Sequence, residues 1–194
     1  MALAISEGTY PIDAVHSQLG FFVTHLDISL VRGTFDVFTG ALTIGSAVAD
    51  VTVLIEAEMA SVNTGNAARD KHILGGDFFD VPNHPQMTFA STSVSETSDG
   101  YELKGDLTIK GITNAVTLAG TYNGSAVFPM DGSTHYGFSM SGTISRSAFG
   151  VSYGVPMVTD DVGLVLETQF IEAASELSLI HISEPTRLGM ISYA

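Results

Sequence analysis

The sequence has no cysteine and no tryptophan, and it has few positive charges. Without cysteine the chain can form neither a disulfide framework nor a thiolate metal site, and it has no thiol nucleophile. Only 7 Lys and Arg residues stand against 21 Asp and Glu residues, which gives a formal net charge of −14 over 194 residues. Proteins that bind nucleic acid, or that dock on anionic lipid through a basic patch, need clustered cations. The composition therefore argues against both functions.

Long hydrophobic runs are also missing. No stretch approaches the ~18 consecutive apolar residues of a membrane-spanning helix. The first eleven residues contain no Lys or Arg and only a short apolar stretch, unlike a secretory signal. We therefore expect a cytoplasmic protein without a transmembrane segment, or a periplasmic protein if a leader precedes this sequence. With 45% hydrophobic and 14% charged residues, the chain is expected to fold around a core.

The C-terminal residues differ in character from the rest. The run LSLIHISEPTR, which begins at Leu177, reads as one translation frame of a sequencing-library adapter. The last residues, ISYA ending at Ala194, resemble the same adapter resuming. We therefore expect one domain over residues 1–176, with residues 177–194 a non-native tail that is set aside from fold reasoning. The alternative is a natural amphipathic C-terminal segment.

Apolar side chains recur at every second position in six segments, and less regularly in residues 31–42 and 86–94, which is the pattern of β-strands with one buried face. These segments are residues 15–25, 31–42, 51–59, 86–94, 101–110, 116–122, 138–144 and 162–170. A sheet with one apolar face must either close on itself or pack against a second sheet. Closure of ~8 strands gives a barrel that is filled by side chains or holds one slim ligand. The sequence therefore predicts an all-β fold, a single eight-stranded antiparallel barrel.

One segment breaks this pattern. Residues 66–74 (NAARDKHIL) contain helix formers and are followed by Gly75-Gly76, so they predict a short helix inserted between strands. Turns or loops are predicted at four pairs that end in glycine. These pairs are Asp99-Gly100, Lys110-Gly111, Asn123-Gly124 and Asp131-Gly132.

The inward-facing side chains of the predicted barrel are candidates to contact a ligand. They either interdigitate in a filled core or wall a tunnel that would select a long apolar molecule, and the sequence leaves both open. The helix, with Phe78 and Phe79 after it, is expected near the barrel mouth. The candidates are Leu19, Phe21, Val23, His25, Phe35, Val53, Ile55, Phe78, Phe79, Phe89, Leu107, Ile109, Phe138, Met140 and Phe149.

Arg69 and Arg146 are further candidates because cations are so rare in this chain, and Asp70 is included because it follows Arg69 directly. A buried arginine needs a carboxylate partner, since desolvation of an unpaired charge costs several kcal/mol. We expect a structural ion pair that fastens the helix or closes the barrel. The alternative is a polar clamp on the head group of a ligand.

Two further functions are considered. A metal-dependent hydrolase or isomerase would use histidines and acids, but the histidines have neither the i, i+4 spacing of a helical metal pair nor the i, i+2 spacing of a strand pair. A Ser-His-Asp device lacks a G-x-S-x-G elbow. The residues weighed for these sites are His16, His25, His72, His84, Asp13, Asp70 and Ser17. The other alternative is a stress or interaction protein with a filled barrel. We expect no metal and no required cofactor.

Several motifs, in this order along the chain, resemble the YceI-like family. The resemblance covers residues 10–173. The motifs are Ile12-Asp13-x-x-His16-Ser17, Phe21-x-Val23-x-His25, Val31-Arg32-Gly33-x-Phe35-x-x-Phe38-x-Gly40, Ser61-Val62-Asn63-Thr64-Gly65, Arg69-Asp70-x-His72-x-Leu74, Asp77-Phe78-Phe79-Asp80, His84-Pro85-x-Met87-Thr88-Phe89, Gly105-x-Leu107-Thr108-Ile109-x-Gly111-Ile112-Thr113 and Arg146-x-x-Phe149-Gly150. The sequence departs at Tyr10-Pro11, where relatives have a tryptophan-rich entry to the first strand.

The resemblance implies an extended, lipocalin-like eight-stranded barrel with a helical insertion. It also implies a long internal cavity that binds a polyisoprenoid, such as the tail of an isoprenoid quinone, for transport or storage. No catalytic residues come with the family, so we expect no enzymatic activity. Many members are exported to the periplasm. From the residues themselves, aromatic side chains at a barrel mouth would also suit pairing of two copies as a homodimer.

Overall fold

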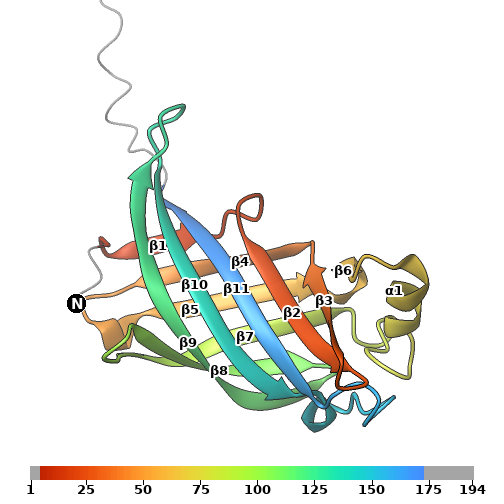
Figure 1. The fold of residues 1–194 in the computed structure, drawn as a ribbon. Helices are drawn as coiled ribbons and strands as arrows, with labels where there is room; N and C mark the ends of the chain where they lie inside the picture. The colour runs from red at the N-terminus through yellow and green to blue at the C-terminus, as the bar shows by residue number, and fades with distance from the viewer. Residues whose placement is uncertain (1–4, 173–194) are drawn as a thin grey trace, which may run out of the picture.

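The structure, a computed structural model, describes residues 5–172, which form one antiparallel sheet curled into a barrel with a single α-helix outside it (Figure 1). The predicted tail, residues 177–194, lies outside the described residues. Within residues 5–172, the helix is too short to span a lipid bilayer. The all-β class predicted from the alternating pattern is confirmed.

Eleven strands make up the sheet, in the order β1-β4-β5-β7-β8-β9-β10-β11-β2-β3-β6. Their bounds are β1 (Gly8–Pro11), β2 (Gln18–His25), β3 (Ser29–Phe35), β4 (Phe38–Ile44), β5 (Thr52–Glu58), β6 (Val62–Asn63), β7 (Gln86–Glu96), β8 (Tyr101–Ile109), β9 (Ile112–Val127), β10 (Thr134–Ser145) and β11 (Asp161–Glu172). The helix is α1 (Ala67–Ile73), and three 3₁₀ turns are η1 (Val48–Asp50), η2 (Met59–Ser61) and η3 (Arg146–Phe149).

The strand number differs from the eight predicted because three long passes of the chain are each broken into two strands. β1 and β2 are separated by a turn, β3 and β4 by Asp36 and Val37, and β5 and β6 by η2. The halves keep matching neighbours, since β1 pairs with β4 and β2 with β3, while β5 pairs with β4 and β6 with β3. The chain therefore makes eight passes around the barrel, as the periodicity indicated, with breaks that the periodicity did not reveal.

The turn between β1 and β2 corrects one predicted strand boundary. Val15 was expected on a strand, but it lies in this turn with 85% of its surface exposed. The carboxylate of Asp13 accepts a hydrogen bond from the Val15 N–H at 3.0 Å, which is the Asx-turn geometry that bends a chain locally. The strand therefore begins at Gln18.

The barrel closes where the chain leaves β1. Ile12 pairs with Phe170 of β11, and the Asp13 N–H donates to the Gln169 carbonyl at 2.8 Å. The Ile12 N–H donates in the other direction, to the Gly40 carbonyl of β4 at 2.9 Å. One short segment thus joins β4 to β11, which completes a ring of hydrogen-bonded strands and leaves only short edges.

The predicted helix is confirmed as α1. Its N-cap is Asn66, whose side-chain oxygen accepts a hydrogen bond from the Arg69 N–H at 3.0 Å, satisfying one of the free amides of the first turn. The segment after α1 is fixed to the barrel because Lys110 Nζ donates to the Gly76 carbonyl at 3.0 Å. In Figure 1, α1 lies at one end of the barrel, beyond β6.

Two of the predicted turns illustrate a confirmed and a wrong prediction. Lys110-Gly111 is the hairpin turn between β8 and β9, with positive φ at both residues (53° and 73°). Asn123-Gly124 is not a turn, because it lies inside the 16-residue β9. The pairing of β9 with β10 slips there, which leaves Asn123 as the extra residue of a β-bulge. Asparagine and glycine favour both structures, so the pair alone does not distinguish them.

Candidate functional site

A cavity of about 580 Å³ lies inside the barrel, so the barrel is hollow and not filled by its own side chains. All fifteen apolar and histidine side chains that the sequence analysis selected as inward-facing lie on its wall, from Leu19 to Phe149. Of the three charged candidates, Arg69 and Arg146 are on the wall and Asp70 is not. The wall includes Leu42 and Phe170 near β1 and His72 near α1, so the cavity follows the length of the barrel.

Strand alternation puts these side chains inside. On β11, Leu164 lines the cavity, whereas its neighbour Val165 points outward with 43% of its surface exposed. Successive side chains of a strand point to opposite faces, so each strand contributes every second residue to the wall. The same rule could have found Leu103, Leu118 and Leu166, which also line the cavity and were missed as site residues.

Glycines on neighbouring strands help to keep the interior open. A Cβ atom added at Gly105 would lie 2.4 Å from the ring of Phe89, and one added at Gly33 would lie 2.4 Å from the ring of Phe21. Both rings are on the cavity wall. Because glycine has no side chain, each ring can lie against the adjacent strand instead of projecting toward the barrel centre. The two rings therefore occupy little of the space inside the barrel.

The cavity opens at the end of the barrel that carries α1. Five of the six exposed side chains on its wall come from the end of β2, α1 and the loop of residues 150–160; Thr121 is the exception. The six are His25, Arg69, His72, Thr121, Tyr153 and Met157. Tyr153 and Met157 lie in an irregular loop, so no periodic signal in the sequence could have selected them.

Aromatic rings connect the two sides of this opening. The His72 ring centroid lies 5.1 Å from Phe78 and 5.2 Å from Tyr153, and Phe78 and Tyr153 are 5.3 Å apart. His72 and Phe78 belong to the helical insertion, whereas Tyr153 belongs to the loop that follows η3. The two pairs that His72 makes are edge-to-face and the third is tilted. Aromatic pairs at such distances are each worth about 0.5–1.5 kcal/mol beyond area burial. The ring cluster therefore holds helix and loop together at the rim.

Arg69 and Asp70 do not form the ion pair that we expected, because both bind Thr64. Arg69 Nε donates to Thr64 Oγ1 and one Nη2 N–H donates to the Thr64 carbonyl, both at 2.7 Å. The Asp70 carboxylate accepts from the Thr64 N–H at 3.0 Å and from its hydroxyl. Asp70 therefore fixes the entry to α1, while the exposed guanidinium of Arg69 keeps its Nη1 donors at the cavity opening.

Arg146 also lacks the carboxylate contact that we expected. It is 7% exposed, and its guanidinium donates to four backbone carbonyls within 3.0 Å. Those acceptors are the carbonyls of Val151, Tyr153, Val158 and Thr159. Burial lowers the pKa of Arg146, and the nearby charge of Asp160 opposes this. The loop of residues 150–160, which we call the rim loop, is thus folded around Arg146, and most of the Arg146 donors are already used.

Asp160 completes the same loop. Hydrogen bonds from the Ser145 hydroxyl, and from the hydroxyl and N–H of Ser147, hold its pKa below the ordinary value. The two Ser147 bonds are both 2.9 Å long. The carboxylate therefore caps η3 and ties the end of β10 to the start of β11.

The three residues weighed for a Ser-His-Asp device, Asp13, His16 and Ser17, serve the turn between β1 and β2. His16 Nδ1 lies 2.7 Å from Asp13 Oδ2, and Ser17 Oγ accepts a hydrogen bond from the Gln169 N–H at 2.9 Å. Partial burial pushes the pKa of Asp13 upward, but hydrogen bonds from His16 and Val15 hold it below the ordinary value. Across residues 5–172, no three His, Asp or Glu side chains converge closely enough to share a metal ion.

A closed antiparallel barrel with an apolar cavity and a helical insertion at its open end defines a lipocalin-like barrel. Residues 10–170 match the model of the YceI-like domain, and the chain belongs to the YceI-like family. A UPF0312 protein of Staphylococcus aureus (strain USA300) is 38% identical over 175 residues, which cover 88% of this chain and 97% of that protein. The resemblance noted in the sequence motifs is thereby confirmed.

Solved structures of related barrels agree with this assignment. The YCEI protein of Campylobacter jejuni is 32% identical, with a TM-score of 0.69 over 78% of this chain and 90% of that chain. BcnA of Burkholderia cenocepacia is 25% identical, with a TM-score of 0.71 over 81% and 98% of the two chains. A polyisoprenoid binding domain from Saccharophagus degradans shares the fold at 15% identity, with a TM-score of 0.62 over 85% and 98% of the two chains.

Proposed function

We propose that this protein binds a long-chain apolar lipid of the polyisoprenoid class inside its barrel and acts as a carrier or store for it, without catalysing a reaction. The observation that carries this proposal is the elongated apolar cavity of about 580 Å³, whose exposed wall residues gather mainly at the α1 end. Ligand cavities typically measure ~300–1,000 Å³ and are lined mainly by hydrophobic and aromatic groups. Each buried Å² of apolar surface contributes about 25 cal/mol to affinity.

The class of ligand is supported by the shape of the cavity and by the family. A slim space that follows the barrel from Leu42 to Tyr153 suits a flexible hydrocarbon chain better than a compact molecule. A structural relative from Saccharophagus degradans is described as a polyisoprenoid binding domain. An isoprenoid quinone or a prenol meets both requirements.

The polar end of the ligand belongs at the opening, because the arginine and histidine side chains of the wall all lie there. Thr64, Arg69 and His72 lie on the wall beside α1, and Tyr153 faces them from the rim loop. The Nη1 donors of Arg69 can bind the oxygen of a quinone, a hydroxyl or a phosphate. Arg146 is a poorer candidate because four of its donors already bind backbone carbonyls.

Extraction of the protein purified from its native host tests the proposal. Organic extracts analysed by mass spectrometry should contain a long-chain isoprenoid in near-stoichiometric amount. Delipidated protein should bind added ubiquinone, menaquinone or a long prenol. Extracts without long-chain lipid, together with no binding of any added isoprenoid, would overturn the proposal.

Two neighbouring residues on β11 provide a matched pair of variants. Leu164→Trp places an indole inside the cavity, whereas Val165→Trp places it on the outer surface. We expect Leu164→Trp to reduce isoprenoid binding strongly and Val165→Trp to leave it unchanged. Equal binding by the two variants would show that the ligand does not occupy this cavity.

A further inference from the structure

Exposed apolar side chains gather on two adjacent segments at the cavity opening. We define them as the mouth patch: Leu26, Ile28, Leu30, Tyr153, Val155 and Met157. The β2–β3 turn and the loop of residues 150–160 lie side by side, because the Leu26 N–H donates to the Met157 carbonyl at 2.7 Å and His25 pairs with Val158. Figure 1 shows the β2–β3 turn beside this light-blue loop. Ile28, at the turn, is 81% exposed.

The mouth patch is continuous with the cavity. Tyr153 and Met157 belong to the cavity wall and also expose about half or more of their surface to solvent, at 50% and 58%. An apolar molecule at the patch is therefore already in contact with side chains that line the interior. Single exposed apolar residues are common on protein surfaces, whereas a contiguous exposed apolar patch typically marks an interaction site.

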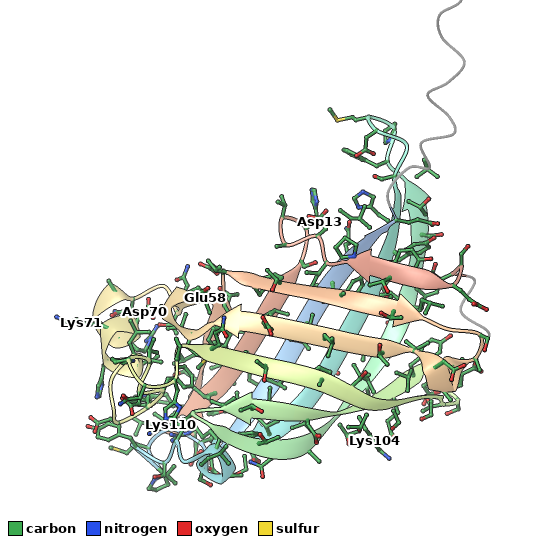
Figure 2. The ribbon with its side chains drawn as sticks, turned by 180° about the vertical axis from the view of Figure 1, so that it is seen from behind. Asp13, Glu58, Asp70, Lys71, Lys104 and Lys110 are labelled. Carbon is green, nitrogen blue, oxygen red and sulfur yellow. The ribbon has the colours of Figure 1, made fainter. Side chains whose placement is uncertain are left out.

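Charge distinguishes this end from the rest of an acidic molecule. The four segments that form it, residues 25–32, 58–84, 109–112 and 146–161, carry five Lys and Arg against six Asp and one Glu, a net charge of −2. The other described residues carry one lysine against twelve Asp and Glu, a net charge of −11. In Figure 2, Lys71 and Lys110 lie at the α1 end, whereas Lys104 lies away from it.

We propose that the mouth patch docks on the surface of a lipid bilayer, with the cavity opening facing the membrane. The direction of cargo exchange rests on the proposed function, whereas the docking itself rests on the patch and the charge distribution. Apolar side chains at the tips of loops gain free energy by entering the interface between head groups and acyl chains. A hydrophobic chain could then pass between bilayer and cavity without crossing water.

The charge distribution sets the orientation. Anionic head groups repel the strongly acidic body of the barrel within a Debye length of ~8–10 Å, and they repel the weakly acidic mouth end least. The molecule therefore approaches an anionic membrane with its cavity opening first. Apolar burial drives this docking, so salt does not weaken the attraction. Added salt does weaken the electrostatic repulsion between the acidic body and the membrane. Binding to anionic vesicles should therefore become stronger when salt is added.

A second exposed apolar hairpin provides the control. Val127, Phe128 and Met130 lie at the β9–β10 connection, and Met130 is 84% exposed, closely matching Ile28. Figure 1 shows this hairpin projecting away from α1, at the opposite end of the barrel. None of its three side chains belongs to the cavity wall. It therefore has the exposure of the mouth patch without its position at the opening.

The absence of tryptophan allows a test with a single fluorescent residue. We would compare Ile28→Trp with Met130→Trp in the full chain, using vesicles of phosphatidylcholine and phosphatidylglycerol that contain brominated acyl chains. We expect vesicles to shift the Ile28→Trp emission to the blue and to quench it, and to leave the Met130→Trp emission unchanged. No change at Ile28→Trp, or equal quenching of the two variants, would overturn the proposal.

A loss-of-binding pair completes the test. Ile28→Ser combined with Met157→Ser removes apolar surface from the patch and should lower vesicle partitioning by about tenfold or more. Met130→Ser should leave partitioning unchanged. If Ile28→Trp is instead buried without vesicles, in a particle of twice the monomer mass, the patch is covered by a second copy and the proposal is wrong. Vesicle binding by protein that yields no isoprenoid on extraction would refute the proposed function alone, and the reverse result would refute docking alone.

Discussion

At the scale of single residues, the rim of the cavity depends on Arg146. Its guanidinium satisfies backbone carbonyls that regular secondary structure would otherwise pair, because four carbonyls of residues 151–159 accept hydrogen bonds from this one side chain. A lysine has the same charge but only one nitrogen, so it cannot reproduce the planar arrangement of donors. The loop conformation is therefore specific to arginine.

We predict that Arg146→Lys destabilises the protein by about 3 kcal/mol, since buried carbonyls left without a donor each cost about 1–3 kcal/mol. Urea unfolding measures this change. The control is Arg32→Lys, because Arg32 is an exposed residue of β3 and surface substitutions usually stay within about 0.5 kcal/mol. Similar unfolding midpoints for the two variants would contradict the role assigned to Arg146.

Asp160 gives the same loop a dependence on pH. Its pKa is lowered in the folded state by hydrogen bonds from Ser145 and Ser147, so the ionised form stabilises the fold. This stabilisation is present above the ordinary carboxyl pKa of about 3.9 and is lost as the pH falls through the folded pKa.

We therefore predict that Asp160→Asn lowers the free energy of unfolding by about 1–2 kcal/mol at neutral pH, through weaker hydrogen bonds to the cap of η3. The difference from the wild type should shrink as the pH falls below about 4. Denaturant unfolding of both proteins across this range measures it. A difference that stays constant down to acidic pH would mean that ionisation of Asp160 does not contribute.

The residues that face the cavity were easier to predict from the sequence than the contacts that individual side chains make. Leu19, Phe21 and Val23 alternate with outward neighbours, so their inward direction follows from strand geometry alone. The partners of Arg146 could not be predicted in this way. They are main-chain carbonyls of an irregular loop. Every residue type has such a carbonyl, so the sequence contains no signal for these contacts.

At the scale of elements, the opening is built by an interaction between the helical insertion and the rim loop. His72 and Phe78 meet Tyr153 across the gap, and Lys110 holds the insertion to the β8–β9 turn. These contacts are few compared with the strand pairing of the barrel wall. The opening is therefore the part of the barrel most easily changed without unfolding it.

We predict that Tyr153→Ala speeds the release of a bound isoprenoid. Removing two ring contacts, each worth about 0.5–1.5 kcal/mol, should raise the dissociation rate by about fivefold or more. Stopped-flow transfer of a fluorescent isoprenoid analogue to an excess of vesicles measures the rate. Phe128→Ala on the far hairpin is the control, and an equal increase in both variants would argue against a gate at Tyr153.

Elements with a strong local signal could be predicted, and their interruptions could not. The capping residue Asn66 and the glycines after residue 74 bound α1 closely. The break between β3 and β4, in contrast, depends on neighbouring strands, because Asp36 donates its N–H to the Ser61 carbonyl of a distant segment. The bulge at Asn123 likewise depends on the register with β10.

At the scale of the whole molecule, the sequence left open whether the barrel is hollow. The apolar pattern is the same for a filled and an empty interior, and the difference lies in how side chains of different strands share space. Phe89 over Gly105 and Phe21 over Gly33 lie flat on the wall only because the strands pair in this register.

An occupied cavity should stabilise the whole barrel. Because only the folded state has the cavity, ligand at about one hundred times its dissociation constant should add ~2.7 kcal/mol to the free energy of unfolding. For a chain of this size that corresponds to a rise in melting temperature of roughly 5–10 °C. Differential scanning calorimetry with and without a prenol or quinone measures it, and Leu164→Trp should show a much smaller rise.

The pairing of β2 with β11 has a consequence for how the chain is made. Leu19 finds its partner in Leu166, near the end of the described chain, so most of the polypeptide must leave the ribosome before the ring can close. Such distant pairings slow folding, since the entropy of a long loop is lost before the contacts form. Until then the apolar inner face of the nascent sheet is exposed to solvent, where chaperones can bind it and where it can aggregate. Substitutions that weaken β11 should therefore lower the yield of soluble protein before they affect the finished barrel.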